Sequence, residues 1–329
     1  MSEGALRRGD VVEVKDAAEI LRTLDPNGAL DAMPFMPEMI PYLGRRFTVA
    51  ARSEKICDTV NTTLRSRRLP NTVLLDDLRC DGSAHGSCQA ECRIYWNEAW
   101  LRPVDSLDAP LRPQDPAAIQ ELLDRTTPAT VQTTAVGEEI RYRCQATEAA
   151  NASEELSNFD PRPYLRELRT VNVPLKRFAR VMARAVVWQP KHRFDRLDRP
   201  KGTSSKSPQG EKLDLQPGEW VRVKPVEEIE ATLTDEGANR GLHFDLEMIP
   251  FCGQVLQVRG RVTQIIDEPN GRMLHFKSDC IKLENAVCSG DYSTGRWLCP
   301  REIIPYWREA WLERVDAPVP RTSIAVTAE

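Results

Sequence analysis

The chain has 329 residues, of which 41% are hydrophobic and 29% are charged, and its formal net charge is −4. This composition is ordinary for a globular protein, and the length predicts two or three domains of the usual size. The negative net charge argues against a protein that binds nucleic acid over its whole surface.

No apolar run approaches the roughly 18 residues that a membrane span needs. The first ten residues, MSEGALRRGD, lack the apolar core of a secretory signal. We therefore expect a cytoplasmic protein, with its thiols kept reduced. The nine cysteines, an odd number, are then expected as metal ligands or buried thiols rather than as a disulfide framework.

An internal duplication dominates the sequence, and repeats are best recognised before any fold is assigned. Residues 9–44 align without a gap on residues 218–253, with sixteen of 36 positions identical. The copies match again near their ends, where YWNEAWLRPVD (95–105) and YWREAWLERVD (306–316) share eight of eleven residues. The identical positions of the first stretch are Gly9, Val12, Val14, Lys15, Glu19, Ile20, Thr23, Leu24, Gly28, Ala29, Phe35, Glu38, Met39, Ile40, Pro41 and Gly44.

Each repeat begins with a glycine turn and an alternating strand, at 9–14 or 218–223. A short helix is predicted at 17–25 or 226–234, where two apolar residues lie four apart on one face. A second alternating strand follows the EMIP turn. Further strands are predicted at NTVLLDDL (71–78) or RMLHFKS (272–278), and at AWLRPV (99–104) or AWLERV (310–315).

Four or five short strands in about 100 residues indicate a small barrel. The predicted fold is mainly β with α segments, in which two tandem small barrels are joined by a partly helical middle segment. The expected organisation is module 1 at 1–106, the middle segment at 107–213, module 2 at 214–316 and a tail at 317–329.

The opening of each repeat, G-D-V-V-x-V followed by P-Y-x-G-x-x-x-V, resembles the SH3-like barrel of nitrile hydratase beta subunits over about 40 residues. The resemblance implies two SH3-like barrels. It implies no hydratase chemistry, because the cysteine cluster typical of the hydratase alpha subunit is absent. CDGSAHGSCQAEC, CQATE and LCPREIIPYWREAWL also resemble a bacterial family of tandem-repeat, cysteine-containing proteins to which no activity is attached.

The middle segment has no counterpart in the duplication. Its first helix is predicted at DPAAIQELLDRTT, with Asp115 as N-cap and Pro116 at the first helical position. A basic amphipathic helix is predicted at 173–188, with Lys176, Arg177, Arg180 and Arg184 on one face. This helix either docks on a protein partner or a membrane surface, or packs its apolar face on the rest of the protein. A polar linker at 201–212 precedes the second repeat.

Four cysteines in each repeat favour a tetrahedral thiolate site for zinc or an iron–sulfur cluster. In the first repeat the candidate ligands are Cys57, Cys80, Cys88 and Cys92, with His85 as a fifth ligand or a substitute for Cys57. A helical turn at 88–92 would put two of these sulfurs on one face. Core thiols and disulfide or redox chemistry are the alternatives.

The second repeat contributes Cys280, Cys288 and Cys299 as candidate metal ligands, and either Cys280 or Cys288 corresponds to Cys80. Cys252 completes its four thiols, and Pro300 suggests a helix beginning at Cys299. No role is assigned to Cys252 or Cys144. The four tryptophans 96, 100, 307 and 311 are expected to pack in the core.

Three functions are compatible with these patterns. The leading hypothesis is a metal-binding scaffold or electron carrier, with zinc or an iron–sulfur cluster as cofactor. The second is a redox or thiol-dependent enzyme with its site between the repeats. The third is a metal-free adaptor that holds protein partners. The sequence contains no phosphate-binding loop, nucleotide fingerprint or H-E-x-x-H motif.

Overall fold

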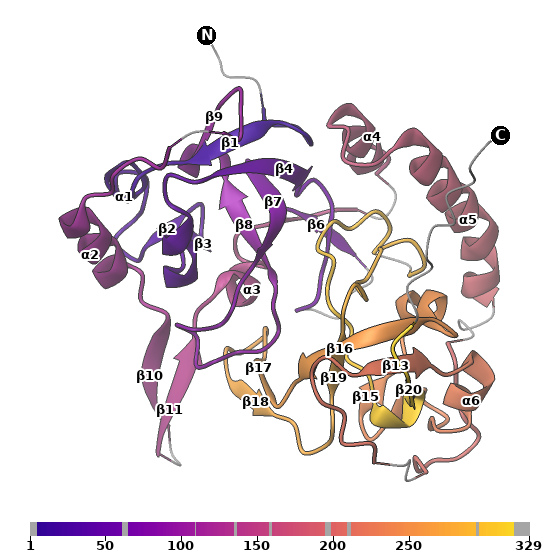
Figure 1. The fold of residues 1–329 in the computed structure, drawn as a ribbon. Coiled ribbons are helices and arrows are strands. Elements are labelled where there is room, and N and C mark those ends of the chain that lie inside the picture. Colours follow the sequence, from indigo (N-terminus) through magenta and orange to yellow (C-terminus); the bar gives the residue numbers. More distant parts are fainter. Residues whose placement is uncertain are drawn as a thin grey trace, which may run out of the picture. The chain divides into compact units, whose positions relative to one another are not determined.

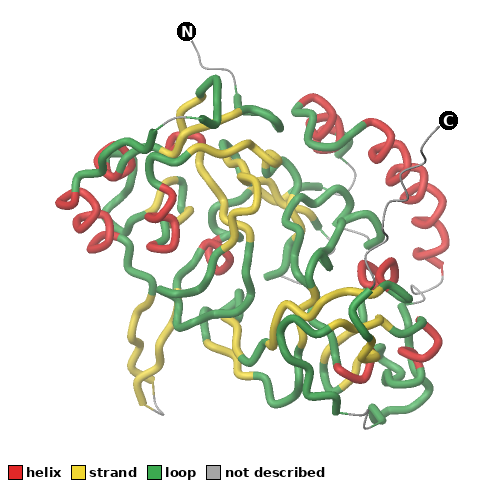
Figure 2. Tube along the Cα trace, viewed as in Figure 1, coloured by secondary structure: helices red, strands yellow, loops and turns green. Residues whose placement is uncertain are grey.

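A computed structural model describes residues 5–60, 65–108, 110–134, 137–157, 160–194, 199–208, 212–293 and 296–318. The chain divides into two compact units. Unit 1 comprises residues 1–197, 263–276 and 287–304, and unit 2 comprises 198–262, 277–286 and 305–329. Figure 1 shows the elements along the chain, and Figure 2 shows the predominance of strands and loops over helices. The expectation of a mainly β protein with α segments is confirmed.

The main sheet of unit 1 has five antiparallel strands in the order β8-β7-β4-β1-β9. Most residues of β1, β7 and β8 are buried, and the core is largely aliphatic with Phe35, Trp96 and Trp100 in it. The strands and their bounds are β1 (Val11–Val14), β4 (Arg46–Arg52), β7 (Thr72–Arg79), β8 (Arg93–Asn97) and β9 (Leu101–Pro103).

Short helices close the ends of this sheet. In α1 (Ala17–Leu21), the Asp16 side chain accepts a hydrogen bond from the Glu19 amide, and the Glu19 side chain accepts one from the Asp16 amide. The two bonds form a capping box. In α2 (Pro116–Arg125), Asp115 caps the first turn, as the sequence predicts. The 3₁₀ turns are η1 (Pro37–Tyr42) and η2 (Glu98–Trp100), and the small ladder is β2 (Ala29–Leu30) with β3 (Met33–Pro34).

The rest of unit 1 consists of the middle segment and of parts of both repeats that lie outside their main sheets. The β10–β11 ribbon projects from the unit in Figure 1, whereas α3 docks on β8 through Gln145, whose side chain bonds the amide and carbonyl of Tyr95. These elements are β5 (Ile56–Cys57), β6 (Ser66–Arg68), β10 (Ala129–Thr134), β11 (Gly137–Tyr142), α3 (Gln145–Glu148), β12 (Glu154–Glu155), α4 (Arg162–Arg169), α5 (Leu175–Phe194), β17 (Gln264–Ile266) and β18 (Met273–His275).

Unit 2 contains a four-stranded antiparallel sheet in the order β19-β16-β13-β20, with Trp307 and Trp311 in its core. Its elements are β13 (Trp220–Val223), α6 (Val226–Glu230), β14 (Ala238–Asn239), β15 (Leu242–His243), η3 (Leu246–Phe251), β16 (Val255–Arg261), β19 (Ile281–Leu283), η4 (Glu309–Trp311) and β20 (Leu312–Val315). Among the described residues of the chain, no helix combines the length and apolarity of a membrane span.

The sheets of the two repeats share one register. Val11 faces Thr48 in β1–β4, and Trp220 faces Gln257 in β13–β16, with both partners shifted by 209 residues. A bulge falls after Val49 in one sheet and after Val258 in the other, which is the same shift. Four strands therefore pair alike in the two copies.

Two features of the second repeat differ from the expected layout. The strand that corresponds to β7 is β19, and the predicted assignment of 272–278 to this role is wrong, because Met273–His275 pairs with β17 instead. The segments 263–276 and 287–304 belong to unit 1, although they lie within the expected module 2. Most of the described middle segment also packs in unit 1.

Candidate functional site

The cysteine-bearing loop of the first repeat joins β7 to β8. Cys80 directly follows β7, and its amide donates to the carbonyl of Cys92 at 2.8 Å, which closes the loop. Gly82 has φ +69°, and a Cβ there would lie 2.1 Å from the Cys88 carbonyl oxygen, so the turn requires glycine. No helix forms at 88–92, and the predicted helical turn is wrong.

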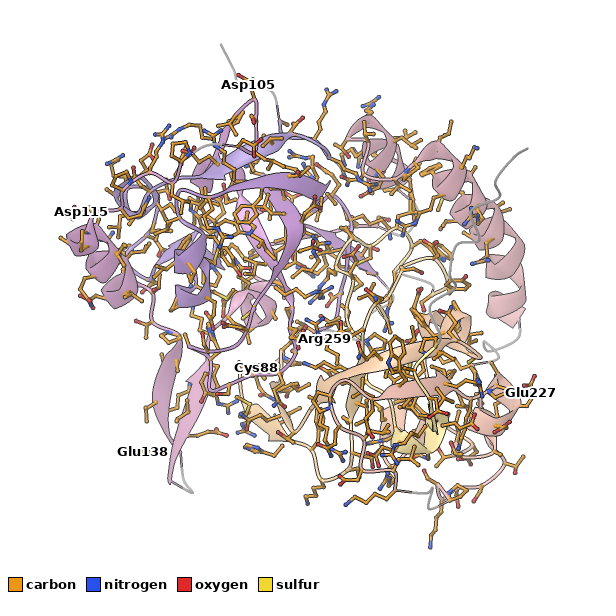
Figure 3. The ribbon with its side chains drawn as sticks, in the orientation of Figure 1. Cys88, Asp105, Asp115, Glu138, Glu227 and Arg259 are labelled. Carbon is orange, nitrogen blue, oxygen red and sulfur yellow. The ribbon has the colours of Figure 1, made fainter. Side chains whose placement is uncertain are left out.

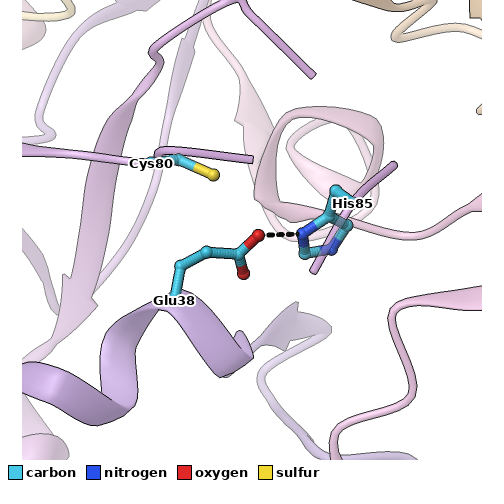
Figure 4. A group of neighbouring side chains, drawn as sticks. All are labelled: Glu38, Cys80 and His85. Carbon is cyan, nitrogen blue, oxygen red and sulfur yellow. Dashed lines mark hydrogen bonds and ion pairs between the residues drawn. The ribbon is translucent and has the colours of Figure 1, made fainter. Parts of the chain in front are cut away.

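Three potential metal ligands meet where this loop packs on η1. The side-chain ligand atoms of Glu38, Cys80 and His85 all lie within 4.8 Å of one another. In Figure 4 the Cys80 sulfur and the His85 ring both lie beside the Glu38 carboxylate. The side chains of Glu38 and His85 are each only 1% exposed. Glu38 and His85 are thus shielded from water, and Cys80 is partly exposed.

The hydrogen bonds of His85 restrict what this group can contain. Nδ1 lies 2.6 Å from Glu38 Oε1, and Nε2 lies 3.1 Å from the carbonyl oxygen of Arg143. Both ring nitrogens therefore face oxygen acceptors. Either one proton lies between Nδ1 and Glu38 Oε1 and belongs to one of the two groups, or a cation takes the place of that proton. In the second case the Nε2–H bond to a carbonyl orients the ring, as is usual for metal-bound histidine.

Two further observations bear on a cation here. Glu38 Oε2 is buried and has no hydrogen-bond partner, so one carboxylate oxygen is unsatisfied. Burial raises the pKa of the Cys80 thiol far above its usual range, and the Glu38 charge raises it further. A bound metal would supply the positive charge that a thiolate and a carboxylate need in this buried place.

The remaining predicted ligands of the first repeat lie outside this group. Among the described residues, Cys80, Cys88 and Cys92 do not assemble within the 4.8 Å that unites Glu38, Cys80 and His85. Burial raises the pKa of Cys92 to about 12 and that of Cys144 to about 11. Their charges contribute to the pKa of Cys80, so both thiols are neighbours of the site. All nine cysteines are present as thiols.

The loop of the second repeat has the same hydrogen bonds. The Cys288 amide donates to the Ile303 carbonyl at 2.8 Å, which matches the bond from Cys80 to Cys92. The Leu298 amide donates to Gly290, as that of Ser87 donates to Gly82. Cys288 therefore corresponds to Cys80, and Cys299 to Cys88. Loop residues run through Cys299, and the helix predicted there does not form.

Cys280 and Cys252 lie in unit 2, outside these loops. Cys280 is buried beside Arg308, whose Nη1 lies 3.4 Å from the sulfur. Cys252 ends η3, and burial raises its pKa to about 11. Neither joins a set of three close ligands among the described residues.

A second cluster in unit 1 surrounds Cys57 and Cys299. The Cys57 amide donates to Cys299 Sγ at 3.3 Å, and the two thiols also share a hydrogen bond. That bond from Cys299, with the charge of Arg301, lowers the pKa of Cys57, whereas burial raises that of Cys299. The pair thus favours a thiolate at Cys57 that accepts a hydrogen bond from the Cys299 thiol.

Two buried cations flank this pair. Arg301 Nη1 lies 3.9 Å from Cys57 Sγ and donates to Thr59 Oγ1 at 2.8 Å. Lys55 Nζ donates to the Trp297 carbonyl at 2.6 Å, and burial lowers its pKa to about 8. Cationic neighbours are a common cause of thiolate formation in proteins.

A pocket of about 350 Å³ lies in unit 1 and reaches Cys299 of this pair. Its lining includes Cys288 and Cys299, with arginines and carboxylates around them. The arginines are already engaged: Arg93 binds Glu302, and Arg177 binds Asp291. The pocket is therefore polar, with thiols in its wall.

The sequence did not indicate three residues of these clusters: Glu38, Lys55 and Arg301. Glu38 is one of the positions identical in both repeats, which was the single available signal. A charged side chain is normally exposed, so nothing local distinguishes a buried one.

The basic face of α5 is partly engaged within unit 1. Arg177 binds Asp291, and the Arg184 guanidinium lies 4.3 Å from the centre of the Tyr292 ring. Lys176 and Arg180 are exposed. The opposite face packs, since Val181 and Ala185 are buried with Trp297 and Leu298.

Comparisons with known proteins give no relative: no family model, no curated protein and no solved structure matches this chain. The resemblance to SH3-like barrels and to a bacterial cysteine-containing family therefore stays a prediction.

Proposed function

We propose that this is a metal-binding protein in which Glu38, Cys80 and His85 hold a zinc ion that pins the cysteine loop to η1. The observation that carries the proposal is the convergence of three chemically suitable ligand atoms within 4.8 Å. Zinc accepts sulfur, nitrogen and oxygen ligands together. Glu38 Oε2 is buried without a hydrogen-bond partner, and a bound cation would supply one.

The ligand set favours zinc over an iron–sulfur cluster, because such clusters are held mainly by four cysteine thiolates. Three protein ligands leave one position for a fourth donor. Cys92 is the thiol best suited to fill it, since its backbone carbonyl already binds the Cys80 amide. The role that follows is a structural scaffold for the loop rather than an electron carrier.

We extend the proposal to the fold and the setting. Each repeat forms a small SH3-like barrel around the sheet whose register the two copies share. The protein acts in the cytoplasm, where its nine thiols stay reduced. The exposed Lys176 and Arg180 remain the part of the basic face open to a protein partner or a membrane surface.

Metal analysis of full-length protein, purified with and without added zinc, tests the proposal. We expect one zinc per chain in the unmodified protein. Cys80→Ser and His85→Gln should each abolish zinc binding, because each removes a ligand. Cobalt in place of zinc should give a sulfur-to-metal charge-transfer band that Cys80→Ser abolishes. Cys252→Ser is the matched control, because that half-buried thiol lies in unit 2.

A protein that folds without stoichiometric metal, and whose His85→Gln variant binds cobalt as the unmodified chain does, would contradict the proposal. The group would then be a buried hydrogen-bonded pair of Glu38 and His85. Metal bound equally well after Cys80→Ser would place the site elsewhere.

A further inference from the structure

The duplicated chain contains two equivalent contacts within unit 1 that differ in chemistry. In one, the Ile266 amide donates to Cys88 Sγ at 3.3 Å. In the other, the Cys57 amide donates to Cys299 Sγ at 3.3 Å. Position 57 corresponds to 266 and position 299 to 88, so each repeat's strand meets the other repeat's loop in the same way.

The neighbouring bonds repeat as well. Gln264 Nε2 donates to the Gly86 carbonyl at 2.7 Å in the first contact. Lys55 Nζ donates to the Trp297 carbonyl at 2.6 Å in the second. The backbone geometry thus requires only a donor at this position, and glutamine satisfies it.

The two contacts differ in three side chains, and only the second contact has reactive and charged ones. Where the first has Ile266, Gln264 and Ala90, the second has Cys57, Lys55 and Arg301. A second thiol and two buried cations are expensive replacements for an apolar side chain, a neutral amide and a methyl group. Packing does not require them, since the equivalent contact forms without them.

The two sulfurs are hydrogen bonded and shielded, with Cys57 3% and Cys299 4% exposed. Access comes through the pocket, because Cys299 forms part of its wall. Arg301 is tied on the other side to Glu268 Oε1 at 3.3 Å and to the Cys57 carbonyl at 3.3 Å, so its charge stays beside the thiols.

We propose that Cys57 and Cys299 form a redox-active dithiol that reduces a small hydroperoxide entering the pocket and closes to a disulfide. This site is separate from the proposed zinc ligands and does not depend on them.

The reaction balances with the hydroperoxide as oxidant. Cys57, the thiolate of the pair, takes the proton from Cys299 as the Cys299 sulfur, which faces the pocket, attacks one oxygen, so an S–O bond forms and the O–O bond breaks. The leaving alkoxide or hydroxide takes up a proton. Cys57 then loses its proton and attacks the sulfenic sulfur, which forms the S–S bond and releases water. Two thiols and one hydroperoxide give one disulfide, one alcohol (or water) and one further water.

The test uses reduced full-length protein, freed of reductant without oxygen and treated with one equivalent of hydrogen peroxide. Remaining thiols are alkylated and the peptides are mapped by mass spectrometry. We expect a peptide pair joined through Cys57 and Cys299 and lighter by two hydrogens, with Cys88, Cys144 and Cys252 still alkylated. Reductant should restore both thiols.

Variants that introduce the residues of the equivalent contact separate the steps. Cys57→Ile copies the residue at position 266 and removes the resolving thiol, so no crosslink should form. A sulfenic acid should appear at Cys299, more slowly than the crosslink in the unmodified chain, and be trapped by a dimedone-type reagent. Arg301→Ala copies Ala90, and crosslinking should slow severalfold at neutral pH and recover as the pH rises. Cys252→Ser should react as the unmodified chain does.

The inference is overturned if Cys57 and Cys299 stay alkylated while other cysteines oxidise, or if peroxide joins cysteines without preference. Equal rates for Arg301→Ala and the unmodified chain at all pH values would also overturn it. The map of the unmodified chain decides the question even where a variant does not fold, and it is independent of bound zinc.

Discussion

Trp100 and Trp311 occupy the same place in the two repeats and make the same hydrogen bond. Trp100 Nε1 donates to Thr23 Oγ1 at 3.0 Å, and Trp311 Nε1 donates to Thr232 Oγ1 at 2.9 Å. Each indole is fully buried and lies edge-on to a phenylalanine, with ring centres 5.3 Å apart. The tryptophans therefore belong to the two cores and offer no surface for stacking a ligand.

Replacing Trp100 or Trp311 by alanine should lower the free energy of unfolding of its unit by about 3–5 kcal/mol, because a large cavity remains. Thr23→Val and Thr232→Val remove only the hydrogen bond and should cost about 1 kcal/mol. Denaturant melts followed by circular dichroism measure both. Losses under about 1 kcal/mol for both alanine variants would show that the rings contribute little to either core.

Glu167 should make stability depend on pH. Burial raises the pKa of the Glu167 carboxyl from 4.5 to about 8. The smaller effects of nearby charges partly cancel, since Lys55 and Arg177 lower this pKa and Glu54 raises it. The unfolded chain releases this proton near pH 4.5 while the folded chain keeps it, so the folded state binds more protons between these values. The contribution of Glu167 to stability therefore falls as pH rises from 4.5 to about 8 and is constant above.

Glu167→Gln keeps a side-chain oxygen for the bond from Asn172 Nδ2, which is 2.9 Å long in the unmodified chain. We expect this variant to gain stability over the unmodified chain progressively across that pH interval. Urea melts at several pH values measure the difference. A difference independent of pH would mean that Glu167 ionises in the folded protein as it does in the unfolded one.

Gln145 should be important for attaching the middle segment to the main sheet. Its side chain accepts from the Tyr95 amide at 2.7 Å and donates to the Tyr95 carbonyl at 2.8 Å and the Pro34 carbonyl at 3.1 Å. Gln145→Ala leaves these buried groups unpaired and should cost about 1–3 kcal/mol. Gln120→Ala, on the exposed face of α2, is the control and should change stability by less than about 0.5 kcal/mol. Equal costs for the two variants would contradict this role.

Removal of zinc should loosen residues 80–92 before the rest of unit 1. Glu38 and His85 attach the first half of this loop, and Gln264 and Ile266 bond its second half. The loop itself has little apolar side-chain surface. Hydrogen exchange with and without a chelator measures the change. Amides of β4 and β7 should keep their protection, and those of the loop should exchange faster. Uniform loss across the unit, or no change in the loop, would contradict a local role for the metal.

Local patterns predicted much of the fold because each depends on residues near one another in the chain. Alternation predicted β1 and its counterpart β13, and Asp115 with Pro116 predicted the start of α2. Helical spacing at 88–92 misled, because the loop there has left-handed residues, Ser87 at φ 59° and Glu91 at φ 50°, which periodicity does not reveal.

The duplication, many of the strands and helices and the burial of the paired tryptophans could be predicted from the sequence, since these follow from periodicity and identity along the chain. Only the tertiary structure brought Glu38 to His85, 47 residues away, and Cys57 to Cys299, 242 residues away. Such pairs depend on which remote segments pack together, and periodicity specifies which face of an element is buried but not its partner. Burial then decides the chemistry, because the same thiol or carboxyl acquires a different charge when water is replaced by protein.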